Sequence, residues 1–175
     1  GVQTAMIATG QTGLMLGESG VALDAVRVDY AAGAVEQSVL RAGEGKDIIF
    51  VEGQGSLLNP GSTATLPLLR GTQPTHLILV HKAGLPHLQH FPDFQIPPLP
   101  KVVALYESVA RAGGTFAPAS VAGIALNTFG LNEKEAQRAI TKASNETGLP
   151  CTDVVRFGAE PLLVQITKIN NLTVN

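Results

Sequence analysis

The sequence predicts an α/β fold, with a mostly parallel sheet and helices flanking it. Short apolar runs rich in β-branched residues end at glycine or small polar residues, and a longer stretch with helical spacing follows each of them. The runs are continuously apolar, which is typical of strands covered on both faces. With 175 residues, of which 45% are hydrophobic, the chain is long enough to form a stable core without a disulfide or a metal.

The predicted strands share a short apolar run that leads into a polar or glycine-containing turn. They are Val2–Ala8, Asp47–Glu52, His76–Val80, Val121–Asn127 and Cys151–Val155.

Four stretches between or after these strands have the apolar spacing of helices. They are Val26–Ala42, Lys101–Ala112, Asn132–Thr147 and Pro161–Ile169, and Gly43, Gly113 and Gly148 stand where the first three should stop. Asn132 is a suitable N-cap, and Glu133 and Glu135 suit the positive end of the helix dipole in the first turn.

The segment Gly84–Pro100 is predicted to be a long loop. It contains five of the eleven prolines and two of the four histidines, and proline suits neither a regular helix nor an inner strand. Loops of this length in a compact domain are usually functional or mobile. A lid or a substrate-facing loop is therefore one interpretation.

Charge and cysteine usage exclude several classes of partner. Twelve basic and fourteen acidic residues give a net charge of -2, and no basic run is present that would bind nucleic acid or an anionic membrane surface. The single cysteine, Cys151, cannot form an internal disulfide, and no apolar run approaches the roughly 20 residues that span a bilayer. We expect a cytoplasmic protein, and the mean hydropathy of +0.21 favours a homo-oligomer.

The first candidate site follows the first strand, where the sequence reads Thr9-Gly10-Gln11-Thr12-Gly13. Ligands of open α/β sheets bind beyond the carboxyl ends of the strands, and small residues there allow backbone amides to approach an anion. The segment is thus a candidate substrate or phosphate site. A tight turn that requires glycine dihedrals is the alternative.

The second candidate site is Glu52-Gly53-Gln54-Gly55, directly after an apolar strand. A carboxylate held at a strand end among glycines suits Mg²⁺, which usually takes one or two carboxylates together with phosphate oxygens. The alternative is a carboxylate that only ends the strand or caps a helix.

Other polar residues at element ends are further candidates. Asp29 is a possible second metal or substrate ligand and Arg27 a partner for an anionic group, although both also suit a solvated helix end. His81 is a candidate proton shuttle and Lys82 a candidate phosphate or carboxylate ligand, although each equally suits a polar strand end. Asn127 has the donor and acceptor that a nucleobase edge requires, although a backbone-bracing role is as common. The turn 59–65 suits an anion site or an ordinary helix cap.

Four segments together resemble the DgcN family of D-glutamate N-acetyltransferases, which was formerly described as a domain of unknown function. They read ATGQTG from Ala8, VEGQGSL from Val51, GIALNT from Gly123 and GLPCTDVVRFG from Gly148. The resemblance implies a P-loop NTPase-like fold similar to dethiobiotin synthetase. It also implies that residues 1–175 are most of one P-loop-like domain, with an N-terminal Rossmann-like domain upstream.

The same resemblance implies roles for individual residues. Glu52 matches a magnesium-side carboxylate, Asn127 an adenine-reading asparagine and, less closely, Asp29 a second metal ligand. A phosphate-binding loop with a Gly-Lys-Ser/Thr ending should precede Gly1, and the chain contains none. We therefore expect the sequence to be a fragment of a longer protein, inactive alone.

The activity implied by the resemblance is acetyl transfer from acetyl-CoA to the amino group of D-glutamate. Glu52 or His81 would be the base, while Arg27, Lys82 or Arg156 would hold the substrate carboxylates and the backbone amides of Gly10–Gly13 and Gly53–Gly55 the oxyanion. One alternative is an ATP- and Mg²⁺-dependent ligase or kinase of the dethiobiotin synthetase type. Another is a non-catalytic binding or assembly fragment.

Overall fold

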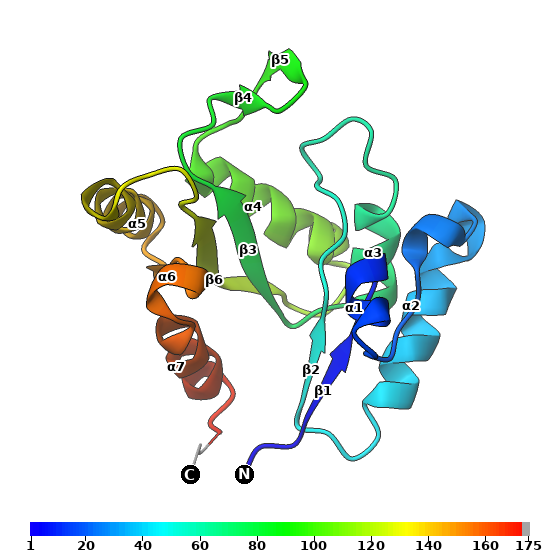
Figure 1. The fold of residues 1–175 in the computed structure, drawn as a ribbon. Coiled ribbons are helices and arrows are strands. Elements are labelled where there is room, and N and C mark those ends of the chain that lie inside the picture. The colour runs from blue at the N-terminus through cyan, green and yellow to red at the C-terminus, as the bar shows by residue number, and fades with distance from the viewer. Residues whose placement is uncertain (173–175) are drawn as a thin grey trace. The chain divides into compact units, whose positions relative to one another are not determined.

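The computed structural model describes residues 1–172 and divides them into two compact units. Unit 1 contains Gly1–Pro74 and unit 2 contains Thr75–Leu172. Each unit has its own parallel sheet with helices beside it (Figure 1). The predicted α/β class is confirmed. Within the described residues, no helix has the length and apolar character needed to cross a membrane.

Unit 1 is built on two parallel strands. β1 (Thr4–Ile7) pairs with β2 (Ile48–Val51), and Ile7 lies opposite Val51. The helices are α1 (Gln11–Met15), the 3-10 helix η1 (Leu23–Ala25), α2 (Val28–Ala42) and α3 (Thr65–Thr72). Apolar side chains from η1, α2 and α3 form the core, in which Leu23, Val35 and Leu68 are buried.

Helices α2 and α3 approach each other closely at Gly71. A Cβ atom placed on Gly71 would lie 2.2 Å from the carbonyl oxygen of Ala32 and 2.7 Å from Cβ of Val35. Both obstacles belong to α2, and one is backbone, so no side-chain rotation relieves the overlap. The glycine therefore sets the distance between the two helices.

We expect Gly71→Ala to lower the free energy of unfolding by about 2 kcal/mol, because overpacking forces the helices apart. Gly33→Ala is the matched control, since Gly33 lies in α2 with open space around it and alanine favours a helix by about 0.5–1 kcal/mol. Urea unfolding should give changes of opposite sign. Equal effects at the two positions would contradict the close approach at Gly71.

Unit 2 contains a three-stranded parallel sheet in the order β3-β6-β7, formed by β3 (His76–Lys82), β6 (Ser120–Asn127) and β7 (Cys151–Thr152). Its helices are α4 (Leu99–Ala110), the 3-10 helix η2 (Ala112–Gly114), α5 (Glu133–Thr147), α6 (Val154–Phe157) and α7 (Glu160–Ile169). Val121, Ile124 and Leu126 on β6 are buried, which agrees with the continuous apolar run.

Most predicted elements are present with small shifts of their ends. Asn132 caps α5 as expected: its side chain accepts a hydrogen bond from the amide of Glu135, and the Glu135 carboxylate accepts one from the amide of Asn132. Gly148 ends this helix in the left-handed conformation, with φ of 71°. Local sequence signals therefore located this helix correctly.

Two predictions were wrong in part. The strand predicted at Cys151–Val155 ends at Thr152, because the Asp153 carboxylate accepts hydrogen bonds from the amides of Val155 and Arg156 and so begins helix α6.

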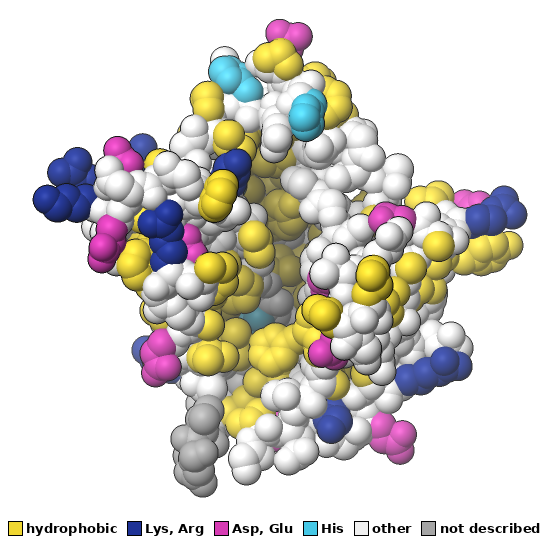
Figure 2. Space-filling view, in the orientation of Figure 1, with side chains coloured by type: hydrophobic (Ala, Val, Ile, Leu, Met, Phe, Trp, Pro, Cys, Tyr) yellow, Lys and Arg dark blue, Asp and Glu magenta, His cyan; other side chains and the backbone are white. Residues whose placement is uncertain are grey.

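The predicted loop Gly84–Pro100 contains an antiparallel hairpin of β4 (His87–Leu88) and β5 (Phe91–Gln95) before α4 begins. The rings of Phe91 and Phe94 contact each other edge to face with centroids 5.8 Å apart. Hydrophobic and histidine side chains gather at this hairpin (Figure 2).

Candidate functional site

The two glycine-rich motifs of unit 1 meet at the carboxyl ends of β1 and β2. The pairing of Ile7 with Val51 brings the turn after β1 beside Glu52. Oε2 of Glu52 accepts hydrogen bonds from the amides of Thr9, at 2.8 Å, and Gly10, at 3.0 Å. The Thr9 hydroxyl donates to the Glu52 carbonyl oxygen at 2.9 Å, so the carboxylate is fixed against the turn.

Glycine at positions 10 and 13 makes room for this carboxylate. A Cβ on Gly13 would lie 2.7 Å from Cβ of Ala8 and 3.2 Å from Oε2 of Glu52. A Cβ on Gly10 would lie 3.2 Å from Oε1 of Gln54 and 3.5 Å from Oε1 of Glu52. Side chains of the second motif thus occupy space that the glycines of the first motif leave.

Gln54 is held from both ends. Its backbone carbonyl accepts a hydrogen bond from the Thr65 hydroxyl at 2.9 Å, and its side-chain Nε2 donates to both carboxylate oxygens of Asp24, at 3.3 and 3.2 Å. Gly55 follows with φ of +72°, and a Cβ there would lie 2.7 Å from the hydroxyl oxygens of Ser62 and Thr65. The turn after β2 therefore requires glycine at this position.

The polar turn 59–65 braces the neighbouring loop. The Ser62 hydroxyl accepts from the amide of Ser56 at 2.9 Å, and Oδ1 of Asn59 accepts from the amide of Gly61 at 2.9 Å. These contacts lie within the turn and to the loop before it, whereas α3 begins after Ala64 without a side-chain cap. The prediction that this turn caps the following helix is therefore wrong, and its other interpretation, an anion site, stays a prediction.

The remaining candidates of unit 1 lie at helix starts and in the turn after β2. Gln11, Thr12 and Gly13 are in the first turn of α1, and Gly53 has open space where a side chain would stand. The Arg27 guanidinium lies over the Tyr30 ring, 5.9 Å from its centroid. Asp29 is exposed in the first turn of α2.

In unit 2, Lys82 and Asn127 share one face of the sheet at its carboxyl edge. They are register partners on neighbouring parallel strands, and both are exposed. Their side chains therefore point the same way. His81 precedes Lys82 and points to the opposite face, where it is half-buried, and burial lowers the pKa of its imidazole. His81 is thus neutral near pH 7.

The loop after Asn127 is tied to the start of α6 by the buried carboxylate of Asp153. Oδ2 accepts hydrogen bonds from the amide and the hydroxyl of Thr128. The Arg156 guanidinium donates to the carbonyl oxygens of Thr128 and Leu131, at 3.4 and 2.8 Å. Arg156, predicted to bind substrate, therefore has a bracing role in this structure.

Asn127 has one side-chain atom committed to its own loop. Its Oδ1 accepts from the amide of Phe129 at 2.8 Å, which leaves the Nδ2 group to donate. Phe129, two residues further along the loop, is 82% exposed. A side-chain donor and an exposed ring in one short loop suit a flat polar ligand.

Metal ligands are sparse in the described part of the chain, which has no group of three or more His, Cys, Asp or Glu side chains able to hold a metal ion. Glu52 and Gln54 offer two oxygens near Gly10. That number suits an Mg²⁺ ion which takes its other ligands from water and phosphate.

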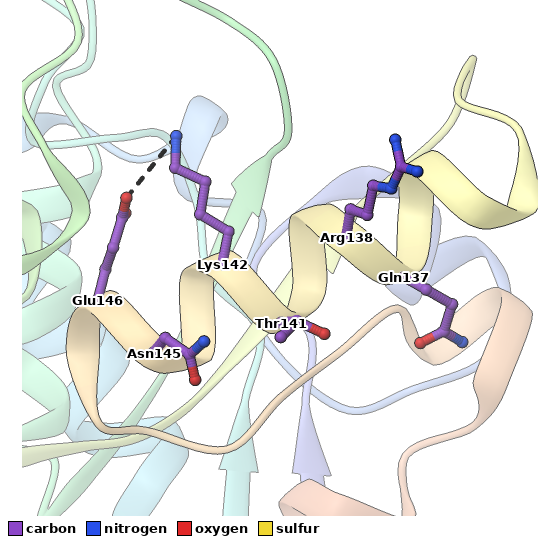
Figure 3. Close-up of a pocket in the computed structure, with 6 residues that line it drawn as sticks. All are labelled: Gln137, Arg138, Thr141, Lys142, Asn145 and Glu146. Atoms are coloured by element: carbon purple, nitrogen blue, oxygen red, sulfur yellow. Dashed lines mark ion pairs between the residues drawn. The ribbon is translucent and has the colours of Figure 1, made fainter.

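One surface hollow contains none of these residues. It has a volume of about 480 Å³ and is lined by α5 residues alone, among them Arg138, Lys142 and Glu146. Lys142 and Glu146 form an exposed ion pair at 3.7 Å (Figure 3). A hollow on one polar helix face has no second wall to enclose a ligand, so we assign it no function.

Sequence reasoning missed Asp24 and Asp153. Asp24 lies 30 positions before its partner Gln54, and Asp153 lies 25 positions after Thr128. Asp153 had a local signal, since an aspartate before a short helix is a common N-cap. No local signal marks Asp24, because its partner Gln54 lies in the turn after β2, far along the sequence.

Parallel strands with helices beside them, and glycine-rich turns after β1 and β2, define the class of the protein as α/β. Residues 1–163 match the family described as "Domain of unknown function (DUF1611_C) P-loop domain", and the chain belongs to this family.

Named relatives and a solved structure extend this result. The chain is 34% identical over 164 residues to a D-glutamate N-acetyltransferase of Tritonibacter scottomollicae and 31% identical over 160 residues to one of a Pseudoalteromonas species. These matches cover 93% and 91% of this chain and 48% and 47% of the relatives. The chain thus spans about half the length of these relatives, and the resemblance inferred from the motifs is confirmed.

A crystal structure of a DUF1611 family protein from Anabaena variabilis superposes with a TM-score of 0.92 at 61% identity. The match covers 96% of this chain and 49% of that one.

Proposed function

We propose that this chain is part of an N-acetyltransferase that moves an acetyl group from acetyl-CoA to the amino group of D-glutamate. The observation that carries the proposal is the Glu52 carboxylate, held through Oε2 by the amides of Thr9 and Gly10. Within the described residues no hydrogen bond engages its Oε1, so this oxygen is available to a proton. Two relatives named D-glutamate N-acetyltransferase support the choice of reaction.

The chemistry requires a base because an ammonium group has no lone pair with which to attack. In the proposed step Glu52 accepts a proton from the substrate ammonium, and the amine nitrogen then attacks the thioester carbonyl carbon. The new C–N bond forms, the C–S bond breaks, and the CoA thiolate leaves and takes up the second proton that the substrate nitrogen loses as it becomes an amide. Glu52 then releases its proton to solvent. The products are N-acetyl-D-glutamate and free CoA.

Backbone amides near the base are suitable donors for the oxyanion of the tetrahedral intermediate. The Gly10 amide donates to Glu52, so we assign this role to the amides of residues 11–13 and 53–55. His81 is the less suitable base, because it is half-buried on the face opposite Lys82.

For unit 2 we propose that the edge formed by Lys82 and Asn127 binds an adenosine phosphate group. The Lys82 ammonium would contact phosphate, and the Asn127 Nδ2 group would donate to the adenine edge. An exposed aromatic ring follows at Phe129, on which a base can stack.

An ATP- and Mg²⁺-dependent ligase or kinase is the second candidate. Membership of a P-loop family and the pair of oxygens from Glu52 and Gln54 favour it. In that reaction Glu52 would be a metal ligand, and turnover would need both ATP and a divalent cation.

The deciding experiment is a turnover assay of the full-length protein with D-glutamate and either acetyl-CoA or ATP, with and without EDTA. We expect thiol release and N-acetylation with acetyl-CoA, unchanged by EDTA. Turnover that requires ATP and stops with EDTA would refute acetyl transfer and support the ligase. L-Glutamate in place of D-glutamate serves as the control for substrate choice.

A further inference from the structure

The amide of Gln54 has one defined orientation. Its Nε2 faces Oδ1 and Oδ2 of Asp24 at 3.3 and 3.2 Å. A carboxylate can only accept hydrogen bonds, so the reversed amide would place Oε1 against two acceptors. Asp24 therefore turns Oε1 of Gln54 away from itself.

Oε1 of Gln54 lies on the same side of Gly10 as Oε1 of Glu52. The position that a Cβ on Gly10 would occupy is 3.2 Å from Oε1 of Gln54 and 3.5 Å from Oε1 of Glu52. None of the hydrogen bonds found among the described residues supplies a donor to either oxygen. Two acceptors without a donor among the described residues, one of them on a charged group, thus lie on the side of Gly10 to which a side chain would point.

Two acceptor oxygens, one of them charged, suit a cationic group that can donate more than one hydrogen bond. A primary ammonium has three donors and no acceptor, so it can satisfy both oxygens at once. Of the groups in the proposed reaction, only the substrate ammonium has this chemistry.

We infer that Asp24 is a positioning residue, which orients Gln54 so that its Oε1 and that of Glu52 together receive the ammonium of the amino-acid substrate. This inference rests on the proposed function. Asp24 is exposed in η1 and is anchored by its buried neighbour Leu23, so its replacement leaves the core intact.

The test compares Asp24→Ala with wild type in the full-length protein, with Glu44→Gln as an exposed acid control in the same unit. For Asp24→Ala we expect the KM for D-glutamate to rise about tenfold, the effect of losing one well-placed hydrogen bond. The KM for acetyl-CoA and the inhibition constant of glutarate, which lacks the amino group, should change less than about twofold. Asp24→Asn keeps one acceptor oxygen, so its KM for D-glutamate should lie between the values of wild type and Asp24→Ala.

A second measurement separates this inference from the proposed reaction. The side-chain amide of Gln54, assigned by its absence from the NMR spectrum of Gln54→Met, should lose its hydrogen-exchange protection in Asp24→Ala. Unchanged protection would overturn the orienting role even if the enzyme acetylates D-glutamate. A wild-type protein without acetyl transfer would refute the proposed function, while the exchange result would still decide what Asp24 does. An equal increase in the KM for D-glutamate and in the inhibition constant of glutarate would also overturn the inference.

Discussion

Replacing Glu52 with glutamine should reduce kcat for acetyl transfer about 100-fold or more, because a positioned general base contributes roughly 10²- to 10⁴-fold. The glutamine carbonyl can still accept the hydrogen bonds that the amides of Thr9 and Gly10 make to Oε2. The turn should therefore keep its shape while the proton acceptor is lost. Steady-state kinetics of the full-length protein measure the effect.

The control for this variant is Glu44→Gln, which makes the same chemical change at an exposed position in the turn after α2. It should retain wild-type kcat. A Glu52→Gln enzyme with kcat within a few-fold of wild type would show that Glu52 is not the base. His81→Gln would then be the next variant to measure, since His81 is the other candidate.

Removing the Asp153 carboxylate should lower the free energy of unfolding of unit 2 by roughly 3 kcal/mol, since buried donors left without an acceptor cost about 1–3 kcal/mol each. The side chain is buried and accepts from the amides of Thr128, Val155 and Arg156 as well as from the Thr128 hydroxyl. Asp153→Ala leaves all of these donors without that acceptor. Denaturant unfolding monitored by circular dichroism measures the loss.

The stabilisation from Asp153 should also depend on pH. Burial alone would raise the pKa of this carboxyl, but hydrogen bonds from Thr128, Arg156 and Val155 outweigh burial and hold the pKa below its usual value of 3.8. A lowered pKa in the folded state means that the stabilisation is present above about pH 4 and is lost as the pH falls through the folded value. The difference between wild type and Asp153→Ala should therefore shrink in acid.

A matched pair of variants at Thr128 tests the same contact from the other side. Thr128→Ser keeps the hydroxyl that donates to Asp153, whereas Thr128→Val replaces it with a methyl group of similar size. We expect the serine variant to be the more stable of the two. Equal stability would mean that the hydroxyl contributes nothing, and a pH-independent difference between wild type and Asp153→Ala would contradict the charge-based account.

The elements that the sequence predicted well are those whose signals are local. Asn132 and Glu135 are three positions apart and cap α5 without help from the rest of the chain. Glu52 was correctly expected at a strand end, because the apolar run before it had to be a strand. The hairpin at 87–95 was missed because its strands are short and contain proline and exposed residues, which give no periodic signal.

The partners of the candidate site were less predictable than its location. Two strand ends were expected to meet, but which atoms meet depends on register and on turn geometry. The contact of Glu52 with the amides of Thr9 and Gly10 spans more than 40 positions. The same limit applies to Asp153, whose interaction with Thr128 joins residues 25 positions apart.

The space left by Gly10 and Gly13 couples the two motifs of unit 1. The Glu52 side chain lies close to where a Cβ on Gly10 or on Gly13 would be, and the Gln54 side chain lies close to where one on Gly10 would be. A change in one motif therefore alters what the other can accommodate. Transplanting either glycine-rich turn alone into another α/β protein should therefore fail to reproduce the site. The two turns therefore form one structural unit, although the 36 residues 16–51 separate the end of α1 at Met15 from Glu52.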